Sequence, residues 1–202
     1  HRGGAQPLTS WGTVVAFVVA AVLVVTHSGA DGQATAFYGQ FATGLLPQFA
    51  KLLILLGAAL AVWMSIGYMR AYGGDRFEFP ILVLFATIGM LMMVSANDLI
   101  ALYMGIELQS LALYVIASIR RDSLKSTEAG LKYFVLGAVS SGMLLYGCSL
   151  IYGFAGSTQF QVLAEVLGKG EPALGLIVGM IFLIAGLAFK ISAVPFHMWT
   201  PD

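Results

Sequence analysis

The sequence predicts an all-α bundle of transmembrane helices, from two features of its composition and one of its pattern. The 202 residues include ten basic and ten acidic side chains, a charged fraction of 10%, whereas soluble domains average roughly 25%. Apolar residues make up 59% of the chain. Because a membrane-spanning helix needs roughly 20 mostly apolar residues, this composition allows about six spans. The apolar runs lack the alternation of a transmembrane barrel, which argues against spanning strands.

Six apolar runs, separated by charged or Gly- and Pro-rich clusters, mark the expected spans. They cover residues 9–26, 49–69, 80–95, 98–119, 127–154 and 172–199 of a single transmembrane domain. The third run is short, which indicates a tilted or locally thinned crossing. The Ser-Ala-Asn-Asp segment at 95–98 is expected to be a tight turn that caps the next helix. Because the chain starts at His1 and stops in mid-pattern, we expect an internal piece that is incomplete at both ends.

Basic residues between the spans predict how the chain is oriented in the membrane. Six lie on the side where the first span starts, namely Arg2, Arg70, Arg76, Arg120, Arg121 and Lys125, and two lie opposite, Lys51 and Lys169. Under the positive-inside rule the first side is cytoplasmic. A net charge of zero argues against a nucleic-acid partner, and scattered charges argue against a peripheral membrane anchor.

Ionisable residues inside the apolar runs are the main functional candidates, because a charge near the bilayer centre costs about 2.5–3.5 kcal/mol unless it faces protein or water. Glu107 lies about 13.5 Å into its expected helix, which is near mid-membrane. Lys190 lies in the last run, which would be about 42 Å long as one straight helix and therefore too long for a bilayer. We expect Pro195 to break or bend this helix. Broken helices are common at ion sites in transporters.

Each candidate also has a structural alternative. Glu107 as a protonated carboxyl would only pack between helices, and Lys190 in a straight helix would extend to a membrane interface. Lys132 follows Glu128 by one helical turn, which is typical of a solvated ion pair at a helix entrance, although the apolar residues that follow draw Lys132 inward. His197 is expected either to relay protons or to pack as a hydrogen-bonded side chain.

The carboxyl and amine groups of the different spans alternate in sign, and the proton occupancy of such coupled charges depends on their separation. Polar side chains are available to hold water between them, namely Tyr103, Gln109, Ser110, Tyr114, Tyr133, Ser140, Ser141, Tyr146 and Ser192. Two pairs of small residues, Gly175 with Gly179 and Gly137 with Ser141, predict close packing of helices.

The sequence lacks the usual marks of a redox or nucleotide site. It contains no Gly-x-Gly-x-x-Gly fingerprint, Walker loop or Cys-x-x-Cys, and its three histidines are too scattered for a haem pair or a metal cage. Its one cysteine, Cys148, is expected to be a small buried side chain. We therefore expect no cofactor and no metal in this chain.

Three stretches resemble one known family. Residues 95–114 (SANDLIALYMGIELQSLALY), 127–142 (TEAGLKYFVLGAVSSG) and 189–202 (FKISAVPFHMWTPD) are similar to the subunit N family of bacterial respiratory complex I, NADH:quinone oxidoreductase. The resemblance covers residues 37–202. The residues around Glu107 and the Gly-Leu-Lys-Tyr-Phe motif at 130–134 favour subunit N over its sister subunits L and M.

This resemblance implies an antiporter-like subunit of roughly fourteen helices built from inverted repeats, of which this chain holds most of the first repeat. It also implies that Glu107 and Lys190, the lysine of the broken helix, form a switching ion pair. Glu128 and Lys132 would form a second charged pair, and His197 falls in the family motif beside the break.

For function, the resemblance implies proton translocation across a bacterial inner membrane, coupled to electron transfer from NADH to quinone in other subunits. NADH, FMN, iron–sulfur clusters and quinone are then expected in partner subunits. The expected partners are the other membrane subunits of the complex and the lipid bilayer. Two alternatives stay open, a subunit of a multi-subunit Na+/H+ antiporter and a scaffold whose buried charges only lock helices together.

Overall fold

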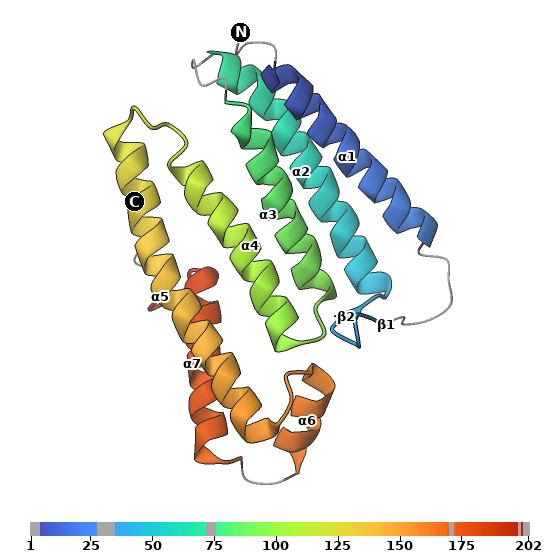
Figure 1. Cartoon of the computed structure of the whole chain (residues 1–202), viewed down its shortest axis with the longest axis vertical. Coiled ribbons are helices and arrows are strands. Elements are labelled where there is room, and N and C mark those ends of the chain that lie inside the picture. The colour runs from blue at the N-terminus through green and yellow to red at the C-terminus, as the bar shows by residue number, and fades with distance from the viewer. Residues whose placement is uncertain (1–4, 28–34, 72–75, 170–171, 198, 200–202) are drawn as a thin grey trace.

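The computed structural model describes residues 5–27, 35–71, 76–169, 172–197 and 199. In these residues the chain forms seven helices and one two-stranded hairpin (Figure 1). The helices are α1 (Ala5–His27), α2 (Leu45–Ala71), α3 (Glu78–Ser95), α4 (Leu99–Ala117), α5 (Leu124–Ala155), α6 (Phe160–Gly168) and α7 (Leu174–Lys190). The all-α fold predicted from composition is confirmed.

Five of these helices are long and apolar enough to cross a membrane. They are α1 to α5, and each coincides with a predicted span to within a few residues at either end. The short third run is extended at its start to an α3 of 18 residues, about 27 Å long at 1.5 Å per residue. Because this length is close to the thickness of a bilayer core, roughly 30 Å, α3 needs little local thinning to cross it.

The five long helices lie side by side, with α1 against α2, α2 against α3, α3 against α4 and α4 against α5 (Figure 1). Consecutive helices run in opposite directions, so the start of α1, the start of α3 and the start of α5 share one end of the bundle. Arg76, Arg120 and Arg121 lie in the connections at this end, which we call the arginine-rich end, and Lys125 lies in the first turn of α5. Arg2, which was predicted to lie there as well, is outside the described residues.

The last predicted span is interrupted, and the interruption comes earlier than Pro195. α7 has 17 residues and ends at Lys190, so it is about 25 Å long and too short to cross the bilayer core alone. Ser192 adopts a left-handed conformation with φ 56°. The Ser192 and Ala193 amides donate to the carbonyls of Phe189 and Ala188, at 3.1 and 2.8 Å. This pair of bonds is a Schellman cap, which ends the helix one turn before the proline.

Two elements lie outside the predicted spans. A hairpin formed by β1 (Thr35–Ala36) and β2 (Phe41–Ala42) precedes α2, and the amphipathic helix α6 follows α5. Both lie at the end opposite the arginine-rich end (Figure 1). The hairpin lies in a connection between spans, so it agrees with the prediction that no strand spans the membrane.

Asp98 fixes the start of α4, as the predicted turn at 95–98 requires. Its carboxylate is 3% exposed and accepts hydrogen bonds from the Ile100 and Ala101 amides, at 2.8 and 3.3 Å. The second carboxylate oxygen accepts a hydrogen bond from the hydroxyl of Thr158, just before α6. This cap supplies partners for helix amides that would otherwise be unpaired, and it ties α4 to the α5–α6 connection.

Small residues bring α7 close to α5. A Cβ added to Gly147 of α5 would lie 2.8 Å from the carbonyl oxygen of Gly179 on α7, and a Cβ at Gly179 would lie 3.0 Å from the Leu150 side chain. The close packing predicted for Gly179 is confirmed. α7 therefore runs along α5 and ends about halfway along it (Figure 1), which places Lys190 inside the bundle.

Candidate functional site

The structure brings Glu107 of α4 and Lys190 of α7 together. The Lys190 Nζ atom lies 3.7 Å from the Glu107 Oε1 atom, and the two side chains are 14% and 19% exposed. Opposite charges at this distance stabilise one another, and they lie among apolar helices where an isolated charge would be costly. We call Glu107, Lys190 and their hydroxyl partners the charge cluster.

Each charged side chain also has hydroxyl partners of its own. Glu107 accepts a hydrogen bond from the hydroxyl of Ser141 on α5. Lys190 donates from its Nζ atom to Ser110 Oγ at 2.9 Å and to the Tyr114 hydroxyl at 3.2 Å. All three hydroxyl-bearing residues are buried. The cluster therefore joins α4, α5 and α7 through polar contacts at a depth where few polar groups occur.

Helical spacing on α4 explains why these partners are available. Glu107, Ser110 and Tyr114 follow one another at three and four residues, so they lie on one face of the helix. On α5 the position facing the Tyr114 ring is Gly137, where an added Cβ would overlap the tyrosine hydroxyl. The missing side chain makes room for Tyr114 to reach Lys190.

The end of α7 provides a second source of electrostatic support for Lys190. Lys190 is the only basic residue in the last turn of this helix. Backbone carbonyls at a helix C-terminus favour a nearby positive charge, typically by 0.3–1 kcal/mol and by more when partly buried. Because the Schellman cap at Ser192 fixes the helix end, it also fixes where this favourable field lies.

Aromatic rings cover the cluster on the side of the segment after α7. The Tyr114 and Tyr133 rings meet edge to face at 4.6 Å, and Tyr133 stacks on Trp199 at 4.7 Å. The Trp199 Nε1–H group donates to the Phe189 carbonyl at 3.2 Å. Trp199 thus lies against the end of α7, where the Phe189 carbonyl accepts hydrogen bonds from both the Trp199 ring and the Ser192 amide.

The second predicted pair, Glu128 and Lys132, forms an ion pair away from the cluster. The Lys132 Nζ atom lies 3.1 Å from Glu128 Oε1, one turn apart on α5, and the side chains are 45% and 58% exposed. They line a hollow of about 210 Å³ together with Lys125 and Ala129 at the arginine-rich end. This geometry matches a pair at a helix entrance.

His197 is exposed, on the segment that follows α7. It lies two residues after Pro195 and two before Trp199, which contacts the helix end. Among the described residues, no group of three or more His, Cys, Asp or Glu side chains is arranged to hold a metal ion.

A comparison with protein families decides the classification. The family model described as NADH:quinone oxidoreductase/Mrp antiporter, transmembrane, matches residues 96–202, which is more than half of the chain and contains the whole charge cluster. The chain belongs to this NADH:quinone oxidoreductase/Mrp antiporter family. Its five apolar helices and this membership make it a multi-pass membrane protein.

Curated relatives within the family point to one subunit. The chain is 59% identical to NADH-quinone oxidoreductase subunit N of Rhodospirillum rubrum over 190 residues, which are 94% of this chain and 39% of that protein. Further relatives at 53–58% identity also carry the name subunit N. The chain spans about two-fifths of the length of the curated relatives it matches.

Solved structures show the same fold. A chain of respiratory complex I from Thermus thermophilus superposes with a TM-score of 0.78 at 34% identity, over 98% of this chain and 42% of that chain. A chain of the Mrp complex from Dietzia sp. gives a TM-score of 0.73 at 22% identity, over 96% of this chain and 38% of that chain. The antiporter-like fold predicted from the sequence is thereby confirmed.

Of the polar residues predicted to lie near the charges, Ser110, Tyr114 and Ser141 contact them, whereas Ser140 and Tyr146 make other contacts. Ser140 donates to the Gly186 carbonyl at 3.2 Å and so joins α5 to α7, whereas the exposed Tyr146 packs edge to face on Phe182. The contact between Asp98 and Thr158 was not predicted. Its only signal in the sequence was the capping residue Asp98, because the partner threonine lies in an irregular connection.

Proposed function

We propose that the full-length protein is the proton-translocating membrane subunit N of a bacterial NADH:quinone oxidoreductase. The observation that carries this proposal is the contact between Glu107 and Lys190, inside apolar helices and at 3.7 Å. The identity of 53–59% to proteins named subunit N supports it. The Mrp likeness at 22% identity reflects a shared fold, so the relatives favour the oxidoreductase over the antiporter alternative.

Proton transfer would use the separation of the two charges. The proton occupancy of two coupled groups depends on the distance between them. When α7 and α4 move relative to each other, this distance changes, while Ser141 stays available to Glu107, and Ser110 and Tyr114 stay available to Lys190. Because each group keeps a hydroxyl partner, neither charged group would be left without a hydrogen bond when the pair opens.

The driving energy would come from electron transfer in other subunits. These partner subunits would hold NADH, FMN, iron–sulfur clusters and quinone, and neighbouring membrane subunits would pass on the electrostatic or conformational change. In this chain, Glu107 and Lys190 would hold and release protons. The stacked rings of Tyr133 and Trp199 would keep water from reaching the pair and letting protons leak past it.

The arginine-rich end would face the cytoplasm, which places the start of α1 on the cytoplasmic side of a bacterial inner membrane. The bias of basic residues toward this end supports this orientation. Glu128 and Lys132 lie at the same end, partly exposed beside a hollow, and would take up protons there. His197 would relay protons beyond α7, where it is exposed.

The test is Glu107→Gln in the full-length protein, because glutamine keeps the size of the side chain and removes its charge. In inverted membrane vesicles we expect quinone-linked NADH oxidation and NADH-driven acidification to fall together, with assembly and ferricyanide reduction unchanged. Glu165→Gln, at an exposed glutamate of α6, is the matched control and should match the wild type. Wild-type acidification by Glu107→Gln would support the scaffold alternative instead.

A further inference from the structure

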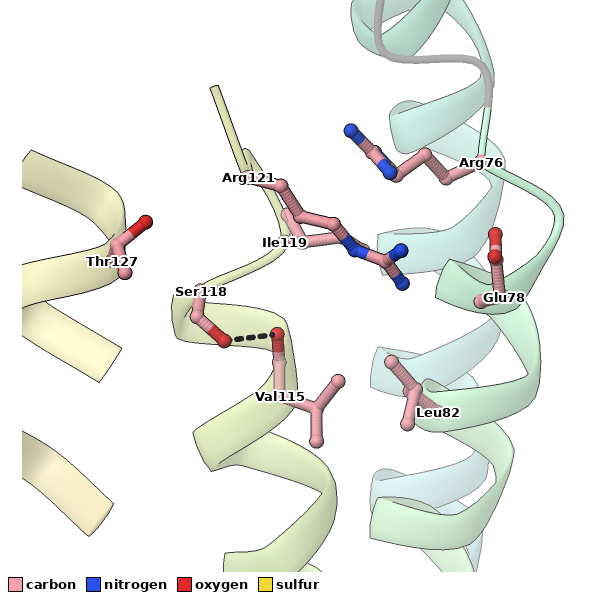
Figure 2. Close-up of a pocket in the computed structure, with 8 residues that line it drawn as sticks. All are labelled: Arg76, Glu78, Leu82, Val115, Ser118, Ile119, Arg121 and Thr127. Carbon is pink, nitrogen blue, oxygen red and sulfur yellow. Dashed lines mark hydrogen bonds between the residues drawn. The ribbon is translucent and has the colours of Figure 1, made fainter. Parts of the chain in front are cut away.

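A partly enclosed hollow of about 270 Å³ lies at the arginine-rich end between the start of α3 and the end of α4. Its lining includes Arg76 and Glu78 from the α3 side and Arg121 from the turn after α4. Figure 2 shows Arg121 extending across the hollow toward α3, with Arg76 on one side of it and Leu82 and Val115 on the other. Nothing in the proton path described above uses this hollow.

The lining of this hollow favours an anion. Two arginines and one glutamate leave it with one net positive charge. Arg76 lies 3.9 Å from Asp122, whose side chain is fully exposed, so that contact holds Arg76 weakly. Arg121 forms no ion pair within the described part of the chain. Both guanidinium groups therefore remain available to a ligand, and arginine binds phosphate oxygens in a bidentate manner.

The neighbouring arginine holds the turn that carries Arg121. The guanidinium of Arg120 donates to the hydroxyl of Tyr68 on α2 at 2.6 Å and lies over its ring. The backbone of the turn is closed by hydrogen bonds from the Arg121 amide to Ile119 and from the Ser123 amide to Arg120. Because the turn is fixed in this way, Arg120 extends toward Tyr68 on α2, and Arg121 extends into the hollow.

The start of α3 adds little to the attraction for an anion. The Phe79 amide already donates to the Arg76 carbonyl at 3.3 Å, and Pro80 has no amide hydrogen. Glu78 is the acidic side chain of the lining, and the two arginines outweigh it.

The wall of the hollow on the side of the middle of α3 and α4 is apolar. Leu82 lies one turn into α3, Val115 lies in the last turn of α4, and Ile119 follows α4. A free phosphate ion would gain nothing from these side chains, whereas the glycerol and first acyl carbons of a lipid would bury apolar area on them. Basic pockets between helix ends at a membrane surface are suited to the headgroups of anionic lipids.

We propose that this hollow binds the phosphodiester headgroup of an anionic phospholipid from the leaflet at the arginine-rich end. Arg76 and Arg121 hold the phosphate, and the acyl chains descend along Leu82 and Val115. A headgroup with one negative charge matches the net charge of the lining. The site does not depend on the proposed proton translocation, because none of its residues belongs to the charge cluster.

The first test uses the complex without any substitution. The purified complex is placed in nanodiscs of phosphatidylcholine alone or with added phosphatidylglycerol, and arginines are labelled with phenylglyoxal. We expect phosphatidylglycerol to slow the labelling of Arg121 and Arg76 and to leave Arg120 unchanged. Equal labelling of Arg121 in both nanodiscs would overturn the proposal. Equal protection by inorganic phosphate in phosphatidylcholine nanodiscs would also overturn it, because the site would then be one for a free anion.

The second test removes the arginines. The complex with Arg76→Gln and Arg121→Gln is compared with the wild type for the phosphatidylglycerol that stays bound after detergent exchange. For each arginine removed, we expect the lipid concentration that gives half-maximal binding to rise about fivefold. Lys125→Gln, at an exposed basic residue of the same end that does not line the hollow, should retain the wild-type amount. Wild-type retention by the double variant would contradict the proposal, and the labelling of the unmodified complex decides it if the double variant fails to assemble.

Discussion

Lys190 Nζ lies 3.7 Å from Glu107 Oε1, although two helices, α5 and α6, separate the two residues in the sequence. α7 makes this contact possible because it ends at Lys190 inside the bundle and packs closely on α5 through Gly147 and Gly179. Both charged groups keep hydroxyl partners besides each other. Each charged group therefore has polar partners that do not depend on the other charge.

Filling the space at Gly137 should displace Tyr114 from Lys190. In Gly137→Ala the new methyl group would overlap the Tyr114 hydroxyl, and overpacking of this kind typically costs about 1–3 kcal/mol. We expect a lower temperature of thermal inactivation and slower quinone-linked NADH oxidation. Gly142→Ala on the same helix is the control, because nothing lies within 4 Å of its added Cβ. Equal behaviour of the two variants would show that the fit of Tyr114 against α5 is unimportant.

Removing the hydroxyl partners of Lys190 should slow turnover without preventing assembly. Hydrogen bonds to charged groups contribute about 1.5–3 kcal/mol each, so Ser110→Ala combined with Tyr114→Phe should reduce NADH-driven acidification by about tenfold or more. Tyr114→Phe keeps the ring that lies 5.7 Å from the lysine Nζ atom. Tyr146→Phe, at an exposed tyrosine of α5, is the control. An acidification rate at the wild-type level in the double variant would count against a role for these hydroxyl groups.

The left-handed conformation of Ser192 predicts a strong dependence on residue type. A β-branched side chain at φ 56° costs about 1–2 kcal/mol or more, so Ser192→Val should disturb the end of α7 and lower both stability and activity. Ser192→Gly should retain both, because glycine adopts this conformation freely. Ser149→Val in the regular part of α5 controls for the substitution itself. If Ser192→Val proved as stable and active as Ser192→Gly, the cap would not determine where α7 ends.

The charged residues of the site could be predicted because membranes make them rare. Glu107 and Lys190 were found from the cost of placing charge in an apolar run, and the spacing from Glu107 to Ser110 and Tyr114 puts all three on one α4 face. The sequence could not predict that Ser141, and not its neighbour Ser140, donates the hydrogen bond to Glu107. Successive residues differ by about 100° around a helix, and α5 is too uniformly apolar for its rotation to follow from the sequence.

The elements that were not predicted are short or depend on tertiary contacts. α6 has nine residues and the strands of the hairpin have two each, so neither forms a long apolar run. α7 ends early because Ser192 adopts a left-handed conformation that glycine usually occupies. In the sequence, the residue that indicated a break was Pro195, three positions later. Hydropathy therefore predicted the spans, whereas the residues at which the helices end were known only from the structure.

Proton exchange at Lys190 is tested most directly by Lys190→Arg, because arginine keeps the positive charge but does not release a proton under physiological conditions. In inverted vesicles with the assembled complex, we expect NADH-driven acidification to fall to the background level. Lys169→Arg, at an exposed lysine after α6, should acidify the vesicles as the wild type does. Wild-type acidification with Lys190→Arg would show that this position serves as a fixed charge and would contradict proton exchange at the Glu107–Lys190 pair.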